Sequence, residues 1–167
     1  MICLTKIFSE VHMRKITLIC VGDLKEKYWV DAIEEYKRRL QRFFEFEIIQ
    51  LPETKLQKNN PSEIQKVITG EGEKILQHIG KQKVISLAVE GQQMSSEKFA
   101  EFIQNESDYN HLCFVIGGSY GLDERVKSLG AKLSFSKMTL PHQLMRVVFV
   151  EQLYRAGTII NNIEYHK

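Results

Sequence analysis

The stretch that decides the fold is "LSFSKMTLPHQLMRVVFVEQLYRA", residues 133–156. It opens with a short strand-like piece, passes through a polar loop of Ser, Lys and Thr, and reaches a Pro-His step. Pro141 suits the first turn of a helix, where its missing N–H costs nothing. The residues after it are apolar on almost every side once they are wrapped on a helix. We therefore expect a helix beginning at Pro141 that is buried on more than one face.

A helix that lies on one sheet has only one face to bury, so this one needs a second layer. Chain threaded around it or a partner subunit would supply that layer; the alternative is a central helix in a larger monomeric core. Its polar residues are informative because an unpaired buried charge is expensive. Glu151 and Arg155 are four residues apart and can pair with each other. Arg146 has no such local partner and is the better functional candidate.

Strand-like and helical patterns alternate along the rest of the chain. Two of the strands are continuous apolar runs, which is typical of a parallel sheet covered on both sides. The fold class is therefore α/β, with a mostly parallel sheet and helices on both faces. We expect Ser62 to cap the second helix, and Ser95 or Ser96 to cap the third. The expected strands are 15–22, 44–51, 84–89, 112–116 and 132–136, and the expected helices are 25–42, 62–79, 95–105, 123–129 and a long one from 141.

Composition places the chain among ordinary globular proteins. Its 167 residues suit one domain, with 43% hydrophobic and 26% charged residues. A net charge of +2 permits a nucleic-acid partner without arguing for one. Cys3, Cys20 and Cys113 are odd in number and far apart, which favours free thiols in a reducing cytosol. We expect no metal site, because no Cys/His cluster has ligand spacing, and no membrane contact, because no apolar run could span a bilayer.

The first residues, "MICLTKIFSEVHM", make a poor signal peptide, because polar residues interrupt the apolar stretch and no cleavage site follows. A strand-like run begins just past Met13. We expect Met13 to be the natural start, residues 1–12 to be an extension of doubtful authenticity, and 13–167 to be a single domain. The alternative is a short ordered N-terminal extension.

Ligands of parallel α/β sheets sit beyond the carboxyl ends of the strands. Three loops qualify: "EGQQMSS" from Glu90, "GGSYGLDE" from Gly117 and "SKMTLPHQ" from Ser136. The glycines either let a backbone approach a ligand or make a tight turn. The dinucleotide fingerprint, the Walker motif and the nucleophile elbow are all missing. These absences count against Rossmann dehydrogenases, P-loop NTPases and α/β-hydrolases.

Two charged stretches each have a plain and a functional interpretation. The tail "NNIEYHK" ends on Tyr165, His166 and Lys167, which either remain solvated or close over an anionic or planar ligand. The cluster "KRRLQR", residues 37–42, either pairs with the preceding Glu34 and Glu35 along a helix or contacts phosphates.

Several stretches together resemble one bacterial family, the RlmH-type large-subunit rRNA pseudouridine methyltransferases of the SPOUT superfamily. They are "MRKITLICVGDLKEKYWVDAIEEYKRRL", "VISLAVEG", "FVIGGSYGL", residues 133–156 and the terminal "YHK", so the resemblance covers residues 13–167. It implies a deep C-terminal trefoil knot and a homodimer. The polar loop 134–139 would then be knotted backbone, and the helix after Pro141 would be covered by the knot and by a second subunit.

The resemblance also implies S-adenosylmethionine as cofactor. Backbone groups would read the adenine edge, and apolar side chains would form the walls. The residues that match the family's cofactor contacts are Leu87, Gly117, Phe135, Ser136, Lys137, Met138, Thr139 and Leu140.

The implied reaction is methylation of N3 of a pseudouridine in 23S rRNA, on the assembled ribosome in the cytoplasm. The N3 proton must leave, so a general base and a nearby positive group would help. His166 is our first candidate for the base, because an imidazole titrates near neutral pH. Arg146 and Arg155 are candidates for anion stabilisation or phosphate contact, and Tyr165 for stacking on the base. Naked rRNA fragments should be poor substrates.

Three other functions stay open. A SPOUT methyltransferase acting on tRNA or another rRNA base differs only in its substrate. A non-catalytic RNA-binding dimer would bind the cofactor without methyl transfer. A small-molecule enzyme with a flavodoxin-like sheet would be a monomer that binds NAD or flavin.

Overall fold

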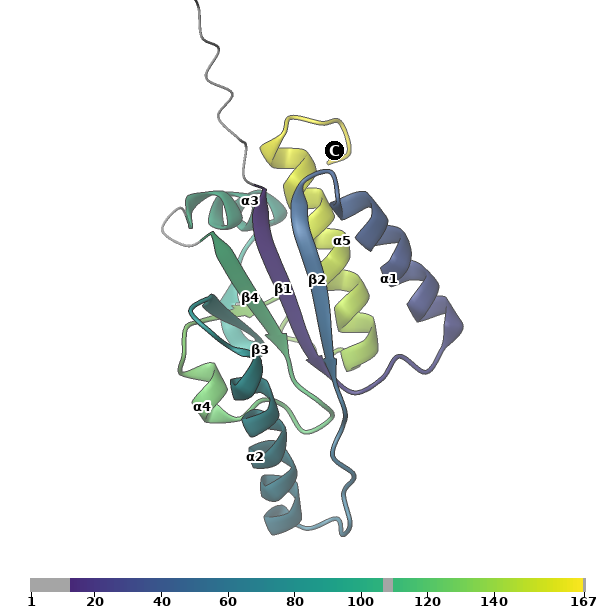
Figure 1. Ribbon diagram of the computed structural model, residues 1–167, viewed down its shortest axis with the longest axis vertical. Coiled ribbons are helices and arrows are strands. Elements are labelled where there is room, and N and C mark those ends of the chain that lie inside the picture. The colour runs from purple at the N-terminus through teal and green to yellow at the C-terminus, as the bar shows by residue number, and fades with distance from the viewer. Residues whose placement is uncertain (1–12, 107–109, 167) are drawn as a thin grey trace, which may run out of the picture.

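A five-stranded sheet forms the centre of the computed structural model, which describes residues 13–106 and 110–166. The strand order is β2-β1-β4-β3-β5 and every paired strand is parallel, so the predicted α/β sheet is confirmed (Figure 1). In chain order the elements are β1 (Arg14–Val21), α1 (Lys27–Leu40), β2 (Phe44–Leu51), α2 (Pro61–His78), β3 (Lys83–Gln93), α3 (Ser96–Asn105), β4 (His111–Ile116), α4 (Glu124–Lys127), β5 (Ala131–Ser134) and α5 (His142–Ile160).

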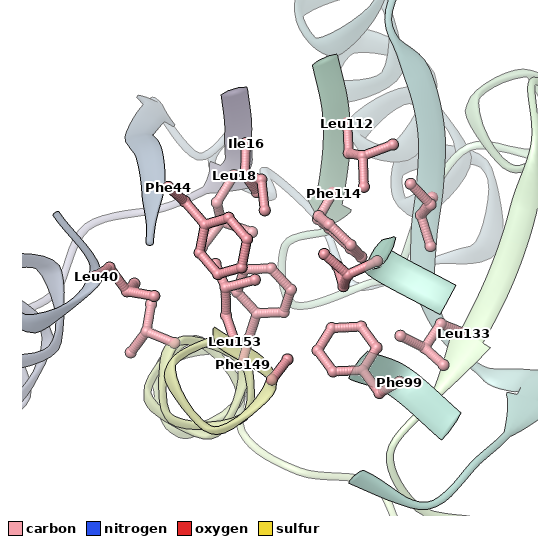
Figure 2. Close-up of a cluster of buried hydrophobic side chains, with 14 of the residues drawn as sticks. Ile16, Leu18, Leu40, Phe44, Phe99, Leu112, Phe114, Leu133, Phe149 and Leu153 are labelled. Atoms are coloured by element: carbon pink, nitrogen blue, oxygen red, sulfur yellow. The ribbon is translucent and has the colours of Figure 1, made fainter. Parts of the chain in front are cut away.

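Helices cover both faces of the sheet, as predicted. Alternate residues of β1 point to opposite faces. Ile16 and Leu18 join a core that α1, α3 and α5 complete, whereas Ile19 packs with the residues of α2 and α4. Figure 2 shows the larger core, in which Phe149 of α5 lies among the strand side chains.

The helix caps confirm one prediction and correct another. Ser95 accepts a hydrogen bond from the Lys98 N–H and caps α3, as expected. Ser62 does not cap α2, because the helix already begins at Pro61, and the side chain of Asn60 accepts the Glu63 N–H at 2.9 Å. Proline is suited to the first helical position, and asparagine is among the best caps before it.

α5 is buried on several sides, as its sequence predicts. No residue between His142 and Ile160 is exposed, and the helix packs between α1 and α3 over the sheet. A Cβ at Gly157 would come within 2.5 Å of Phe43 Cδ2, so the contact with the α1–β2 turn is close. Leu144 is only half-buried in the single chain, whereas the half-buried Val147 packs against the core. The face of α5 that carries Leu144 therefore keeps apolar surface for a further layer.

Cys20 and Cys113 are buried free thiols, as predicted. Cys3 and the whole of the segment 1–12 lie outside the described residues, as does Lys167. Over the two described ranges, no helix combines the length and the apolar character needed to cross a membrane.

Candidate functional site

A cavity of about 570 Å³ lies at the carboxyl edge of the sheet, where part of β3 meets the segments after β4 and β5. Two of the three predicted loops, those from Gly117 and Ser136, wall it. The third prediction is wrong, because the strand expected over 84–89 continues to Gln93, and of the stretch from Glu90 only Glu90 itself lies on the wall. The polar loop that follows β5 organises itself: Ser134 Oγ donates to the carbonyl of Ser136, and Ser136 Oγ accepts from the Met138 N–H at 3.0 Å. Its backbone is therefore held before any ligand arrives.

Most of the predicted cofactor residues line this cavity. Leu87 comes from β3, and Gly117 follows the last residue of β4. Lys137 is the exception, because it does not contribute to the wall. The predicted residues on the wall are Leu87, Gly117, Phe135, Ser136, Met138, Thr139 and Leu140. The structure brings them together, and their contact with a cofactor stays a prediction.

The glycine loop after β4 is both a tight turn and a cavity wall. Gly118 and Gly121 form an isolated bridge, and Gly121 has a φ of +88°, which favours glycine. A Cβ at Gly117 would lie 2.7 Å from the backbone of Gly121. The two interpretations of this loop are therefore compatible.

Sequence reasoning missed four polar residues of the cavity wall: Glu90, Ser119, Lys127 and His142. Lys127 Nζ lies 2.7 Å from Glu90 Oε1, and this contact lowers the pKa of the Glu90 carboxyl. Glu90 begins one of the predicted loops, and His142 belongs to the Pro-His step. Their positions in the sequence, next to the expected strand ends, could therefore have indicated that they belong to the site.

A polar corner adjoins the cavity; we define it as Gly22, Glu53, Ser119 and His142. Ser119 Oγ donates to Glu53 Oε1 at 2.7 Å. A Cβ at Gly22, whose φ is +89°, would be 3.5 Å from His142 Nε2 and 3.8 Å from Glu53 Oε2. Burial, and secondarily Arg146, lower the pKa of the His142 imidazole, against an opposing effect of Glu53.

Glu71 lies behind the glycine loop with 2% of its surface exposed. Its Oε1 accepts the Thr54 N–H at 2.9 Å, while Oε2 has no hydrogen-bond partner among the described residues. Burial raises the pKa of this carboxyl, and Glu53 adds to the effect. Despite these carboxylates, residues 13–106 and 110–166 contain no group of three His, Cys, Asp or Glu residues suited to a metal ion.

Arg146 is 1% exposed and does not line the cavity. Its Nη2 donates to the carbonyls of Val21 and Gly22 at 2.6 and 2.8 Å. Nε and Nη1 are buried without a partner in the described part of the chain. The guanidinium therefore ties the start of α5 to the end of β1, and it offers no surface to a phosphate in this arrangement.

The other three predicted catalytic residues form a network near the far end of α5. Arg155 Nε donates to Glu151 at 3.1 Å, which confirms the predicted local pair. The Arg155 guanidinium lies 4.8 Å from the Tyr165 ring centroid, and the Tyr165 hydroxyl donates to Glu151 at 3.2 Å. His166 Nε2 is 2.7 Å from Glu97 Oε1. Tyr165 and His166 are thus half-buried against α5 and α3 rather than solvated.

This network is remote from the cavity of its own chain. None of its members lines the cavity. At 1.5 Å per helical residue, Arg155 lies about 20 Å along α5 from His142. In Figure 1 the chain ends beside the last turns of α5, away from the arrowheads of β1 and β4.

The basic cluster on α1 is largely explained by helix ion pairs. Lys37 lies 2.8 Å from Glu34, and Arg39 lies 2.7 Å from Glu35. Arg38 also pairs with Glu35, so the two preceding glutamates together hold three of the cluster's cations. The plain interpretation therefore accounts for most of these charges.

Comparisons with known proteins agree with this architecture. Residues 14–166 match the family described as "Predicted SPOUT methyltransferase". The chain is 50% identical over 157 residues to the ribosomal RNA large subunit methyltransferase H of Lactobacillus helveticus, which covers 91% of this chain and 99% of that relative. It is 50% identical over 159 residues to the protein of the same name from Streptococcus mutans, and the match covers 92% of this chain and 99% of that relative.

A solved tRNA (m1G37) methyltransferase from Aquifex aeolicus has a TM-score of 0.49 at 13% identity. The match covers 84% of this chain and 69% of that one, a likeness too weak to carry a conclusion. The chain therefore belongs to the SPOUT methyltransferase family, within the group named ribosomal RNA large subunit methyltransferase H.

Proposed function

We propose that this protein transfers a methyl group from S-adenosylmethionine to N3 of a pseudouridine in 23S rRNA, on the assembled cytoplasmic ribosome. The observation that carries the proposal is the cavity at the carboxyl edge of the sheet, walled by the self-organised loop after β5. Relatives of nearly the same length and about half identical bear the name of an rRNA methyltransferase, which supports the substrate class.

The residues around the cavity fit the cofactor. Its volume lies in the range of small-molecule sites, and Leu87, Phe135 and Leu140 supply apolar walls for an adenine ring. The glycine turn and the loop after β5 bring backbone to the cavity wall, and backbone N–H and C=O groups are suited to orienting the polar edges of a cofactor. When bound, S-adenosylmethionine supplies an electrophilic methyl group, and the protein has to position the acceptor nitrogen and remove its proton.

The tail network suits contact with RNA. Arg155 offers a planar guanidinium that can pair with phosphate, and Tyr165 offers a ring for stacking. Both are only half-buried, and their partners are side chains rather than backbone. We assign them to substrate binding, with His166 beside them. Arg146 is assigned a positioning role instead, because its guanidinium is committed to the β1 end.

A homodimer would unite the tail with a cavity. Within one chain the tail network lies near the last turns of α5 and the cavity near its first turn, and the proposed dimer brings the tail of one subunit to the cavity of the other. The half-buried apolar face of α5 at Leu144 is the surface we assign to such a contact. Leu144→Asp should therefore shift the protein to monomers in sedimentation at micromolar concentration, while Val30→Asp on the exposed face of α1 should not. Dimers that persist in Leu144→Asp would contradict this arrangement.

The direct test uses purified protein, labelled S-adenosylmethionine and ribosomes from a strain that lacks the corresponding gene. We expect label in 23S rRNA, and nucleoside mass spectrometry should identify N3-methylpseudouridine. Naked 23S rRNA and bulk tRNA are parallel substrates. Label in tRNA alone would replace the proposed substrate, and saturable cofactor binding without label in any RNA would favour a non-catalytic dimer.

A further inference from the structure

We propose that His142, in the polar corner beside the cofactor cavity, is the group that accepts the N3 proton of the target base. This inference rests on the proposed function and deepens it, because it assigns the acid–base chemistry to a residue at the start of α5. The competing candidate is His166 in the tail.

The topology of the sheet favours this corner as the place where the acceptor base docks. In the order β2-β1-β4-β3-β5 the chain reverses its direction of winding between β1 and β4. Ligands of open parallel sheets bind in the crevice outside the strand ends at that point. Gly22 follows β1 and Gly117 follows β4, so the corner stands at the crevice.

The corner and the cofactor cavity share a wall. Ser119 and His142 both line the cavity, and Ser119 also donates to Glu53 at 2.7 Å. Near Gly22, which carries no side chain, lie the imidazole Nε2 and the second oxygen of Glu53. A flat base that enters the cavity beside Ser119 and His142 would therefore lie close to a proton acceptor and to the methyl donor.

Charged groups on three elements face the imidazole. They are Arg146 of α5, Glu53 after β2, and Lys25 after β1. Burial and the two cations disfavour the imidazolium, so the resting ring is neutral and able to accept a proton. Glu53, held by Ser119, opposes them and stabilises the imidazolium once it forms.

The step balances without a further reactant. Nε2 of neutral His142 takes the N3 proton, the electron pair left on N3 bonds to the methyl carbon, and the carbon–sulfur bond of the donor breaks with its electrons remaining on sulfur. His166 is less suited to this step, because both of its ring nitrogens are already engaged, Nε2 by Glu97 and Nδ1 by Arg155.

The test compares His142→Gln with His166→Gln in single-turnover methyl transfer to ribosomes, with His78→Gln on the exposed side of α2 as the matched control. We expect His142→Gln to lower the rate at pH 7 by about 100-fold, the usual scale of general-base catalysis, with cofactor affinity in calorimetry unchanged. Its rate should rise about tenfold per pH unit as hydroxide replaces the base, whereas the wild-type rate should be flat from pH 7 to 9. His78→Gln should match the wild type.

Two further readouts test the assignment, and the first of them does not depend on methyl transfer. NMR titration of the cofactor-free protein should place the His142 imidazole largely neutral at pH 7, and His142→Gln identifies its resonance. In His142→Ala, added imidazole should restore part of the lost rate in a saturable manner.

The results distinguish a failure of the role assigned to His142 from a failure of the proposed methyltransferase function. An active wild type with His142→Gln within threefold of it would overturn the role of His142 and leave the proposed function standing. A parallel loss of cofactor affinity, or an imidazole mostly protonated at pH 7, would overturn it too. A wild-type protein that transfers no label to ribosomes would instead contradict the proposed function itself.

Discussion

The two parts of α5 each carry an arginine, and the two arginines are held in opposite ways. Arg146 is 1% exposed and donates to two backbone carbonyls. Arg155 keeps about a quarter of its side chain exposed and is held by the carboxylate of Glu151 and the ring of Tyr165. Side-chain partners can rearrange when a phosphate arrives, whereas backbone carbonyls at the end of a central strand cannot. Depth of burial therefore separates an arginine that shapes the site from one that can bind substrate.

The largest expected effect is on stability and concerns Arg146, the buried arginine of the pair. Arg146→Met should lower the free energy of unfolding by about 2–4 kcal/mol, because two buried carbonyls lose a charged donor. Urea titration measures the change. Arg155→Met is the matched variant on the same helix, and its loss should stay below about 1 kcal/mol, as for other partly exposed ion pairs. Equal losses for the two variants would contradict the distinction.

The cavity gives the next effect. Gly117→Ala should weaken S-adenosylmethionine binding by at least about tenfold, or about 1.4 kcal/mol, because the added Cβ meets the Gly121 backbone and the turn must shift. Calorimetry measures the affinity. Gly80→Ala is the control, since a Cβ there meets nothing within 4 Å. Unchanged binding in Gly117→Ala would remove the glycine turn from the cofactor site.

The next effect is on methyl transfer and concerns Arg155, the more exposed arginine of the pair. Arg155→Met should lower methyl transfer to ribosomes by about tenfold, the scale of one charged hydrogen bond, with cofactor affinity within twofold of the wild type. Single-turnover rates and calorimetry on the same preparations test this. An undiminished rate would leave the Arg155 network as a structural element only.

The smallest effect concerns Glu71, behind the glycine loop. Its folded-state pKa is raised by burial, so the stability linked to it is full below the unfolded pKa and is lost as the pH rises through the folded pKa. Glu71→Gln lacks this dependence and should become more stable relative to the wild type between pH 4 and 8. Urea titrations across that range measure the difference, with Glu73→Gln on the exposed side of α2 as control. A constant difference would contradict the raised pKa.

The sequence predicted much of the site because parallel α/β sheets place ligand loops at one edge. The loops after β4 and β5 follow directly from the apolar runs before them, and they meet as expected. The third strand was predicted to end at Val89 but continues to Gln93, so β3 itself walls the cavity where a loop was expected. The prediction placed the cap of α2 at Ser62, two residues too late. Asn60 is the capping residue, and Pro61 occupies the first helical position. The tail was expected to be either solvated or bound to a ligand. In the chain itself, Tyr165 and His166 pack on α5 and α3.

By itself the sequence determined the alternation of strands and helices, the parallel sheet and the burial of α5, since each rests on periodicity within a short segment. Only the tertiary structure decided which polar groups meet. Ser119 bonds Glu53 across 66 residues, and Arg146 reaches the β1 end across 125. Such pairs depend on strand order and on the path of the chain between strands, and no local pattern of residues encodes either. The acid–base chemistry of the site is set by these long-range contacts, because they decide which charge is buried and which neighbour faces it.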